Sequence, residues 1–330
     1  MKVFSSKRQS GPSRHNSQRK VLPAHLQAGS NETVRRRWKL SFTALFTVLL
    51  VIAGMSAASY PTIANWFSEY ASSKVLKNYV KKEKHVVPSY VEQLAQAHAY
   101  NDALDAGAIV LKAGDRKPSS SGGESGSGLD YDKMLSADDE GTMGWLTIPK
   151  IHVNLPIYHG TSDEVLEKGV GHLEGTSLPV GGPSTRAVLS AHRGLAKATL
   201  FTHLDKVGVG DRFAVNVLGE TMTYQVITTQ VVDPDDTEAL RIERGKDLVT
   251  LVTCTPLGIN TSRILVTGQR VYPTPKADIA AAKQAPRIPP FPWWAVWMSA
   301  TVAVSAVYVW RMGYAPSPGS AKKHEATGRS

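Results

Sequence analysis

Two stretches of the chain contain only apolar and uncharged residues, and each is long enough to cross a lipid bilayer. The first covers residues 40–60 and the second covers residues 291–310, runs of 21 and 20 residues. A helix needs about 20 such residues to span the hydrocarbon core of a membrane. Tryptophan and tyrosine rings cluster towards the ends of the second run, where they favour the lipid–water boundary. The pattern predicts two transmembrane helices.

Between these runs the pattern of apolar positions changes twice. In residues 61–112 apolar residues recur every three or four positions, which predicts a helical stalk or accessory segment. Residues 113–142 begin with a Gly/Ser-rich stretch and are expected to form a flexible loop. From 143 to 273, short β-branched segments bounded by Gly, Pro, Asn and Asp predict strands. Residues 274–290 are expected to be a linker to the second run.

The strand-forming region predicts a mostly β domain, either a closed barrel or a sandwich. Leu218, Gly219 and Glu220 supply a hairpin turn between two of the predicted strands. Two short helices are expected as well, one over Asp163–Lys168 and one over Lys197–His203.

The net charge of +10 comes from the two ends of the chain. Residues 1–39 carry ten Lys and Arg and one acidic residue, and residues 311–330 carry four and one. The remaining 271 residues hold 24 basic and 26 acidic side chains, which argues against a basic nucleic-acid-binding face. Positive flanks stay in the cytoplasm. We therefore expect a two-pass protein of the cell membrane, with both termini cytoplasmic and residues 61–290 extracellular.

Each apolar run also has an alternative interpretation. The small residues Ser56, Ala57 and Ala58 resemble a signal-peptide cleavage site, although the run is longer than a usual signal core. The second run has the length of a buried core helix too, but its flanking arginines and terminal aromatic residues favour a membrane helix.

The chain has one cysteine, Cys254, at the end of a predicted strand. A single cysteine excludes an intramolecular disulfide framework and any multi-thiolate metal site. Free cysteines are often simply buried. On the oxidising side of a membrane, however, an unused thiol is a liability, so Cys254 is a candidate nucleophile.

A thiol nucleophile needs a proton acceptor and a donor for the developing oxyanion. His192 ends another predicted strand, but His152, His159, His172 and His203 compete with it on spacing alone. Arg263 lies nine residues after Cys254. If their two strands form a hairpin, the guanidinium lies beside the thiol; otherwise Arg263 is an ordinary surface arginine.

These residues lie in recognisable motifs. Thr250 to Cys254, followed by Arg263 and by Leu265-Val266, resembles the signature of the sortase family, and Leu189 to Gly194 is similar to the family's histidine motif. The segments 156–161 and 171–179, together with the second apolar run, resemble the pilin-polymerising class C sortases.

The resemblance implies an eight-stranded closed sortase-type β-barrel with catalytic residues His192, Cys254 and Arg263. It implies a cysteine transpeptidase that cleaves an LPXTG-like sorting signal of a pilin or surface protein at Thr–Gly, with hydrolysis as a side activity. The acyl group then passes to a pilin lysine amine. Class C sortases typically carry an Asp-Pro-aromatic lid motif before the barrel, and no such triplet occurs between residues 106 and 144. A lid in residues 113–142 would lack the Asp-Pro-aromatic residues that usually hold the lid in the active site.

Other functions remain open at this point. The acceptor amine belongs either to a pilin lysine or to the peptidoglycan precursor, because the motifs around Cys254 serve both reactions. A non-catalytic, membrane-tethered binding domain and a papain-like peptidase are further alternatives. No phosphate loop, dinucleotide fingerprint or metal-ligand cluster occurs, so we expect no cofactor and no metal.

Overall fold

The computed structural model describes residues 38–83, 86, 88–106, 131–138, 141–284 and 288–314. Most of both basic tails lies outside these residues. So do residues 113–130, 139 and 140 of the expected flexible loop.

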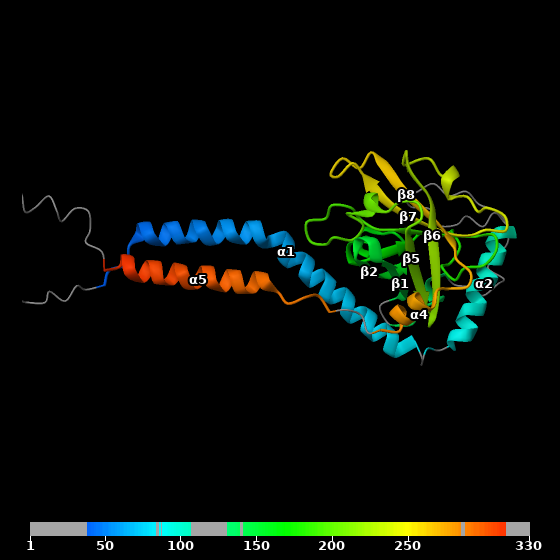
Figure 1. The fold of residues 1–330 in the computed structure, drawn as a ribbon, viewed down its shortest axis with the longest axis horizontal. Coiled ribbons are helices and arrows are strands. Elements are labelled where there is room, and N and C mark those ends of the chain that lie inside the picture. Colours follow the sequence, from blue (N-terminus) through cyan, green and yellow to red (C-terminus); the bar gives the residue numbers. More distant parts are fainter. Residues whose placement is uncertain are drawn as a thin grey trace, which may run out of the picture.

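Eight strands close into one barrel in the order β1-β2-β3-β4-β7-β8-β6-β5 (Figure 1). The strands are β1 Thr142–Ile148, β2 Val153–His159, β3 Val170–His172, β4 Thr185–Ser190, β5 Arg212–Val217, β6 Glu220–Val232, β7 Asp247–Thr255 and β8 Ser262–Arg270. β2 pairs with β3 and β4 pairs with β7 in parallel, and the other pairs are antiparallel. The predicted mostly β barrel is confirmed.

Short helices precede, connect and follow the strands. They are η2 Tyr131–Lys133, η3 Pro149–Ile151, α3 Asp163–Lys168, η4 Leu204–Lys206, η5 Glu238–Leu240 and α4 Lys276–Ala282. The expected helix over Asp163–Lys168 is confirmed, and Ser162 caps it by accepting a bond from Val165 N–H. The predicted turn joins β5 to β6, with Leu218 and Gly219 at φ values of 45° and 82°.

The expected helix over Lys197–His203 is wrong. This segment forms turns, and a short helix, η4, begins only at Leu204. Two of its backbone N–H groups bond to distant partners. Thr199 N–H donates to the Asn65 side chain, and Phe201 N–H donates to the His192 carbonyl. Since those N–H groups are used elsewhere, the repeating bonds of a helix do not form.

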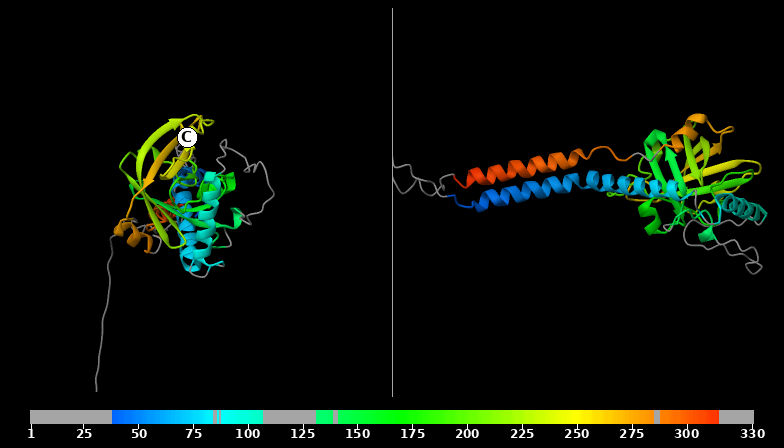
Figure 2. Two further views of the ribbon diagram at one scale, coloured as in Figure 1. Left: turned by 90° about the vertical axis from the view of Figure 1, so that its right-hand side faces the viewer. Right: turned by 90° about the horizontal axis from the view of Figure 1, so that it is seen from below.

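Two long helices extend away from the barrel and lie side by side (Figures 1 and 2). They are α1, Phe42–Lys82, and α5, Trp293–Met312, and both are long and apolar enough to cross a membrane. Trp66 on α1 donates its indole N–H to the Pro290 carbonyl, 2.8 Å away, just before α5. Pro61 lies within α1, where it removes one backbone donor. The helix changes direction between its stretch beside α5 and its stretch against the barrel (Figure 1).

Helices α1 and α2 (Tyr90–Ala106) are fastened to the barrel by buried polar side chains. The Tyr79 hydroxyl on α1 donates to the Met143 carbonyl and accepts from Leu218 N–H, each at 2.9 Å. On α2, Asn101 accepts from the Leu178 N–H and donates to the Leu178 carbonyl. Since both side chains are fully paired, burying them costs little, and the helices are held in fixed positions on the barrel.

Candidate active site

Cys254 and Arg263 lie directly opposite each other on the antiparallel strands β7 and β8. Opposed residues of an antiparallel pair point to the same face of the sheet, with their Cβ atoms about 5 Å apart. Both side chains are half-buried, at the end of β7 and the start of β8. The two strands therefore form the hairpin that would bring Arg263 beside Cys254. The thiol and the guanidinium lie on the same face of the sheet.

His192 follows β4, the parallel neighbour of β7. Ser190 pairs with Val252, and beyond that pair the two chains stay together, because Ala191 N–H donates to the Val252 carbonyl at 3.2 Å. The Thr253 hydroxyl in turn donates to the Ala191 carbonyl at 2.8 Å. When this register is continued by two residues, His192 comes to lie beside Cys254. The backbones of adjacent strands are about 4.8 Å apart. The three predicted residues thus come from three neighbouring strand ends.

Among the described residues, the hydrogen bonds of Arg263 stay within its own hairpin. Its Nη1 donates to the carbonyls of Asn260 and Ser262, at 2.9 and 3.1 Å. Within the part of the chain that the structure describes, no carboxylate forms an ion pair with it. An uncompensated guanidinium beside a thiol is suited to bind a carbonyl oxygen or a developing negative charge.

Glu167 interacts electrostatically with Lys197 and, more weakly, with His192. Glu167, in the last turn of α3, forms a 2.7 Å ion pair with Lys197. The hydrogen bond and charge of Lys197 hold the pKa of Glu167 below its ordinary value, and His192 makes a smaller contribution in the same direction. Because Lys197 lies in the loop that follows His192, this ion pair links that loop to α3.

Two of the four competing histidines, His172 and His159, bond to other parts of the chain. His172 is fully buried, and its Nε2–H donates to the Ser177 carbonyl at 2.9 Å, so that Nδ1 accepts from the Tyr131 hydroxyl. Burial lowers the pKa of His172 to about 4. The two ring nitrogens of His159 lie against the carbonyls of Met134 and Gly141. Both imidazoles connect loops to the barrel.

Comparisons with known proteins identify the family to which this chain belongs. Residues 146–271 match the model of the Sortase domain. The crystal structure of sortase C1 from Streptococcus agalactiae is 44% identical, with a TM-score of 0.54, over 60% of this chain and 98% of that one. The chain belongs to the sortase family. Sortase C-1 from Actinomyces oris is 45% identical, with a TM-score of 0.50, over 56% of this chain and 99% of that one.

Both structural neighbours are class C sortases, so the resemblance to that class is confirmed. Among curated proteins, sortase D from Bacillus subtilis strain 168 is 35% identical over 131 residues. That match covers 39% of this chain and 63% of sortase D. The similarity to sortase D is thus confined to less than half of this chain.

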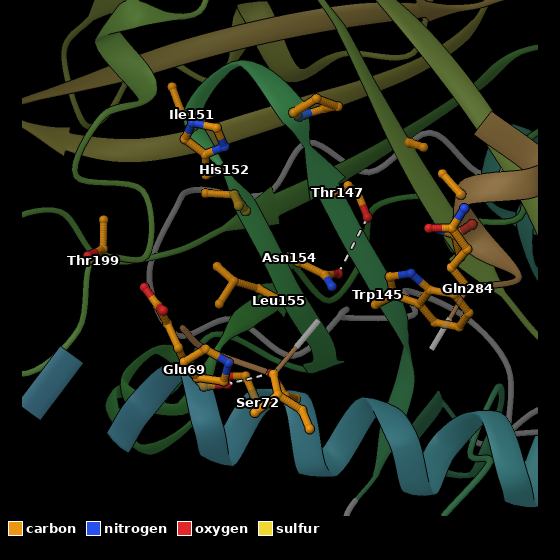
Figure 3. Close-up of a pocket in the computed structure, with 18 of the residues that line it drawn as sticks. Glu69, Ser72, Trp145, Thr147, Ile151, His152, Asn154, Leu155, Thr199 and Gln284 are labelled. Atoms are coloured by element: carbon orange, nitrogen blue, oxygen red, sulfur yellow. Dashed lines mark hydrogen bonds between the residues drawn. The ribbon is translucent and has the colours of Figure 1, made fainter. Parts of the chain in front are cut away.

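A cavity of about 890 Å³ lies elsewhere on this sortase, between α1 and the outer face of the barrel (Figure 3). Glu69 and Ser72 project from α1 towards Asn154 and Leu155 of β2. Its lining reaches Thr199 but contains none of the three predicted site residues. The cavity and the thiol-bearing strand ends are therefore separate features of the molecule.

Sequence reasoning missed several residues that shape this sortase site. Arg193 donates to the Thr255 hydroxyl at 2.9 Å, next to Cys254. Asn65 bonds to Thr199 from a helix far away in the sequence. The adjacency of Arg193 to His192 was the one available signal, whereas nothing in the sequence pattern links positions 65 and 199.

Proposed function

We propose that this chain is a membrane-anchored cysteine transpeptidase that joins proteins through an LPXTG-like sorting signal. The observation that carries the proposal is the placement of Cys254 opposite Arg263, with the His192 strand end alongside, in a chain of the sortase family. Catalytic roles for these three residues follow from their chemistry. In the first step the Cys254 thiolate attacks the Thr carbonyl carbon of the signal, and a C–S bond forms.

The Thr–Gly C–N bond then breaks, and protonated His192 gives its proton to the departing glycine amine. Arg263 stabilises the oxyanion of the tetrahedral intermediate by charge-assisted hydrogen bonds. The product is a thioester on Cys254, which retains the energy of the amide bond, so no nucleotide is required.

In the second step an amine attacks the thioester carbonyl. A new C–N bond forms, the C–S bond breaks, and His192 takes the proton from the amine. We propose a pilin lysine as the acceptor, because the class C sortases are the structural neighbours of this chain. Helices α1 and α5 would hold the enzyme and its membrane-tethered substrate on one surface, which raises their effective concentration.

The test uses the full-length protein in detergent, a pilin that carries a sorting signal, and a reactive lysine on the same pilin. We expect lysine-linked oligomers with the wild-type enzyme and none with Cys254→Ala or His192→Ala. Replacing the pilin lysine by arginine is the matched substrate control. Cleavage of the signal without lysine-linked oligomers would reject the pilin acceptor in favour of a peptidoglycan-precursor amine. Full activity of Cys254→Ala would reject the enzyme altogether in favour of a binding domain.

A further inference from the structure

We propose that Arg193 is a positioning residue, which ties the loop that carries His192 to the strand end that carries Cys254. This inference rests on the proposed function. The Arg193 side chain is only 10% exposed. Its Nη1 donates to the Thr255 hydroxyl at 2.9 Å, and its Nε donates to the Thr202 carbonyl at 3.2 Å. Its Nη2 forms a 3.0 Å ion pair with Asp205.

These three contacts reach two different segments of the chain. Thr255 is the residue after Cys254, and Thr202 and Asp205 lie at the far end of the loop that begins at His192. A guanidinium is planar and rigid, so its donors hold their partners at fixed relative positions. Arg193 therefore sets where the loop sits relative to the end of β7, and with it the separation of the imidazole and the sulfur.

The loop itself is closed by bonds that leave it little freedom. Phe201 N–H donates to the His192 carbonyl at 3.1 Å, and Gly194 N–H donates to the Thr202 hydroxyl at 3.1 Å. Gly194 has a φ of 78°, and a Cβ at this position would collide with the Leu257 side chain. The β7–β8 loop thus packs closely against the residue next to Arg193.

The two arginines near Cys254 differ in how their charge is compensated. Asp205 neutralises Arg193, whereas Arg263 has no carboxylate partner among the described residues. A free guanidinium suits a substrate, while a buried, paired one suits a connection between segments. Arg193 therefore acts on the reaction through His192 and Cys254, without touching the substrate.

The test measures thioester formation with a sorting-signal peptide in the full-length protein. Arg193→Lys keeps the positive charge but loses the planar set of N–H donors of the guanidinium. We expect kcat to fall by about 10- to 100-fold, the loss that a displacement of about 1 Å produces, with KM for the peptide unchanged. We also expect the pH profile of the step to change, because the proton transfer by His192 depends on the distance between the imidazole and the reacting atoms.

Thr255→Val removes only the contact with the end of β7 and leaves the Arg193–Asp205 ion pair in place. It should lower kcat in the same direction. If Arg193 acts through Thr255, the double variant should be no worse than Arg193→Lys alone.

Arg186→Lys is the matched control. Arg186 lies on β4, the strand that precedes His192, is 4% exposed, and pairs with Glu243 at 2.7 Å, but it lies near the opposite end of that strand from His192. We expect a lower Tm with kcat and pH profile unchanged in the folded protein. Wild-type kcat and pH profile in Arg193→Lys would overturn the positioning role. A wild-type enzyme that forms no thioester would instead overturn the proposed function.

Discussion

The side-chain oxygen of Asn65 accepts two hydrogen bonds from Thr199, one from its backbone N–H and one from its hydroxyl, each 2.7 Å long. Asn65 belongs to α1, one of the two helices apolar enough to cross a membrane, and Thr199 lies on the loop that follows His192. The Asn65 amide also donates to Glu69 at 2.8 Å, so its orientation is fixed. Helix α1 is thus a structural support of the loop beside the candidate active site.

Asn65→Ala should loosen this loop. It leaves two donors of Thr199 without their partner, at a cost of about 1–3 kcal/mol for a buried group and less where water replaces it. We expect amide hydrogen exchange at Thr199 to become faster by about tenfold, which corresponds to about 1.4 kcal/mol of local opening. Glu69→Gln, which keeps an oxygen facing the Asn65 amide, is the control and should exchange at the wild-type rate. Unchanged exchange in Asn65→Ala would show that α1 does not hold the loop.

Arg263→Lys tests the role of the guanidinium fork. Lysine keeps the positive charge but loses the planar pair of donors. We expect thioester formation to slow by about 100-fold, comparable with loss of one oxyanion donor. The Tm should barely change, because the hydrogen bonds that the structure describes for Arg263 go to carbonyls of its own hairpin. A variant that reacts at the wild-type rate would remove Arg263 from the proposed mechanism.

The buried His172 makes stability depend on pH. Burial lowers the pKa of His172 to about 4, with a smaller contribution from His159, while its bond to the Ser177 carbonyl acts in the opposite direction. In the unfolded chain a histidine titrates near 6.5. Between these values the unfolded state binds more protons than the native state. Stability is therefore fully present above pH 6.5 and is lost as the pH falls towards 4.

The difference between the two pKa values corresponds to a stability loss on the order of 3 kcal/mol. Denaturant unfolding of the full-length protein at pH 7 and at pH 4.5 measures it. In His172→Gln, which lacks the titrating ring, the free energy of unfolding should be lower at pH 7 and should change less between the two pH values. An equally steep pH dependence in this variant would assign the acid sensitivity to other groups.

The charge distribution predicts the membrane topology. With ten basic residues before the first apolar run and four after the second, both ends of the chain should lie in the cytoplasm. Protease added outside wall-stripped cells should digest the barrel and spare an epitope tag at either end. A digested N-terminal or C-terminal tag would contradict this topology.

Most strands could be predicted from the sequence, because β-branched segments with clear boundaries favour strands over helices. The strand β3 has only the three residues Val170–His172, so it carries no periodicity from which the sequence could predict it. The helix expected over residues 197–203 was wrong because contacts with Asn65 and His192 outweigh the local helix preference of that segment. The parallel pairing of β4 with β7 depends on long-range packing and is not encoded in any local pattern.

The candidate site was predictable in part for a similar reason. Cys254 and Arg263 are close in sequence, so a hairpin alone brings them together. Choosing His192 among the competing histidines required the motif around it, because a single imidazole carries no pattern. The contacts of Arg193 with Thr255 and Asp205 join separate loops, and only the three-dimensional structure reveals them.

The most direct test of the central claim is to trap the acyl-enzyme. The full-length protein is mixed with a sorting-signal peptide, quenched in acid, and analysed by mass spectrometry of its proteolytic fragments. We predict that the peptide acyl group, cut after threonine, is attached to the fragment that contains Cys254, and that the adduct is absent in Cys254→Ala. A cleaved peptide with no adduct on Cys254, or an adduct that persists in Cys254→Ala, would contradict the account.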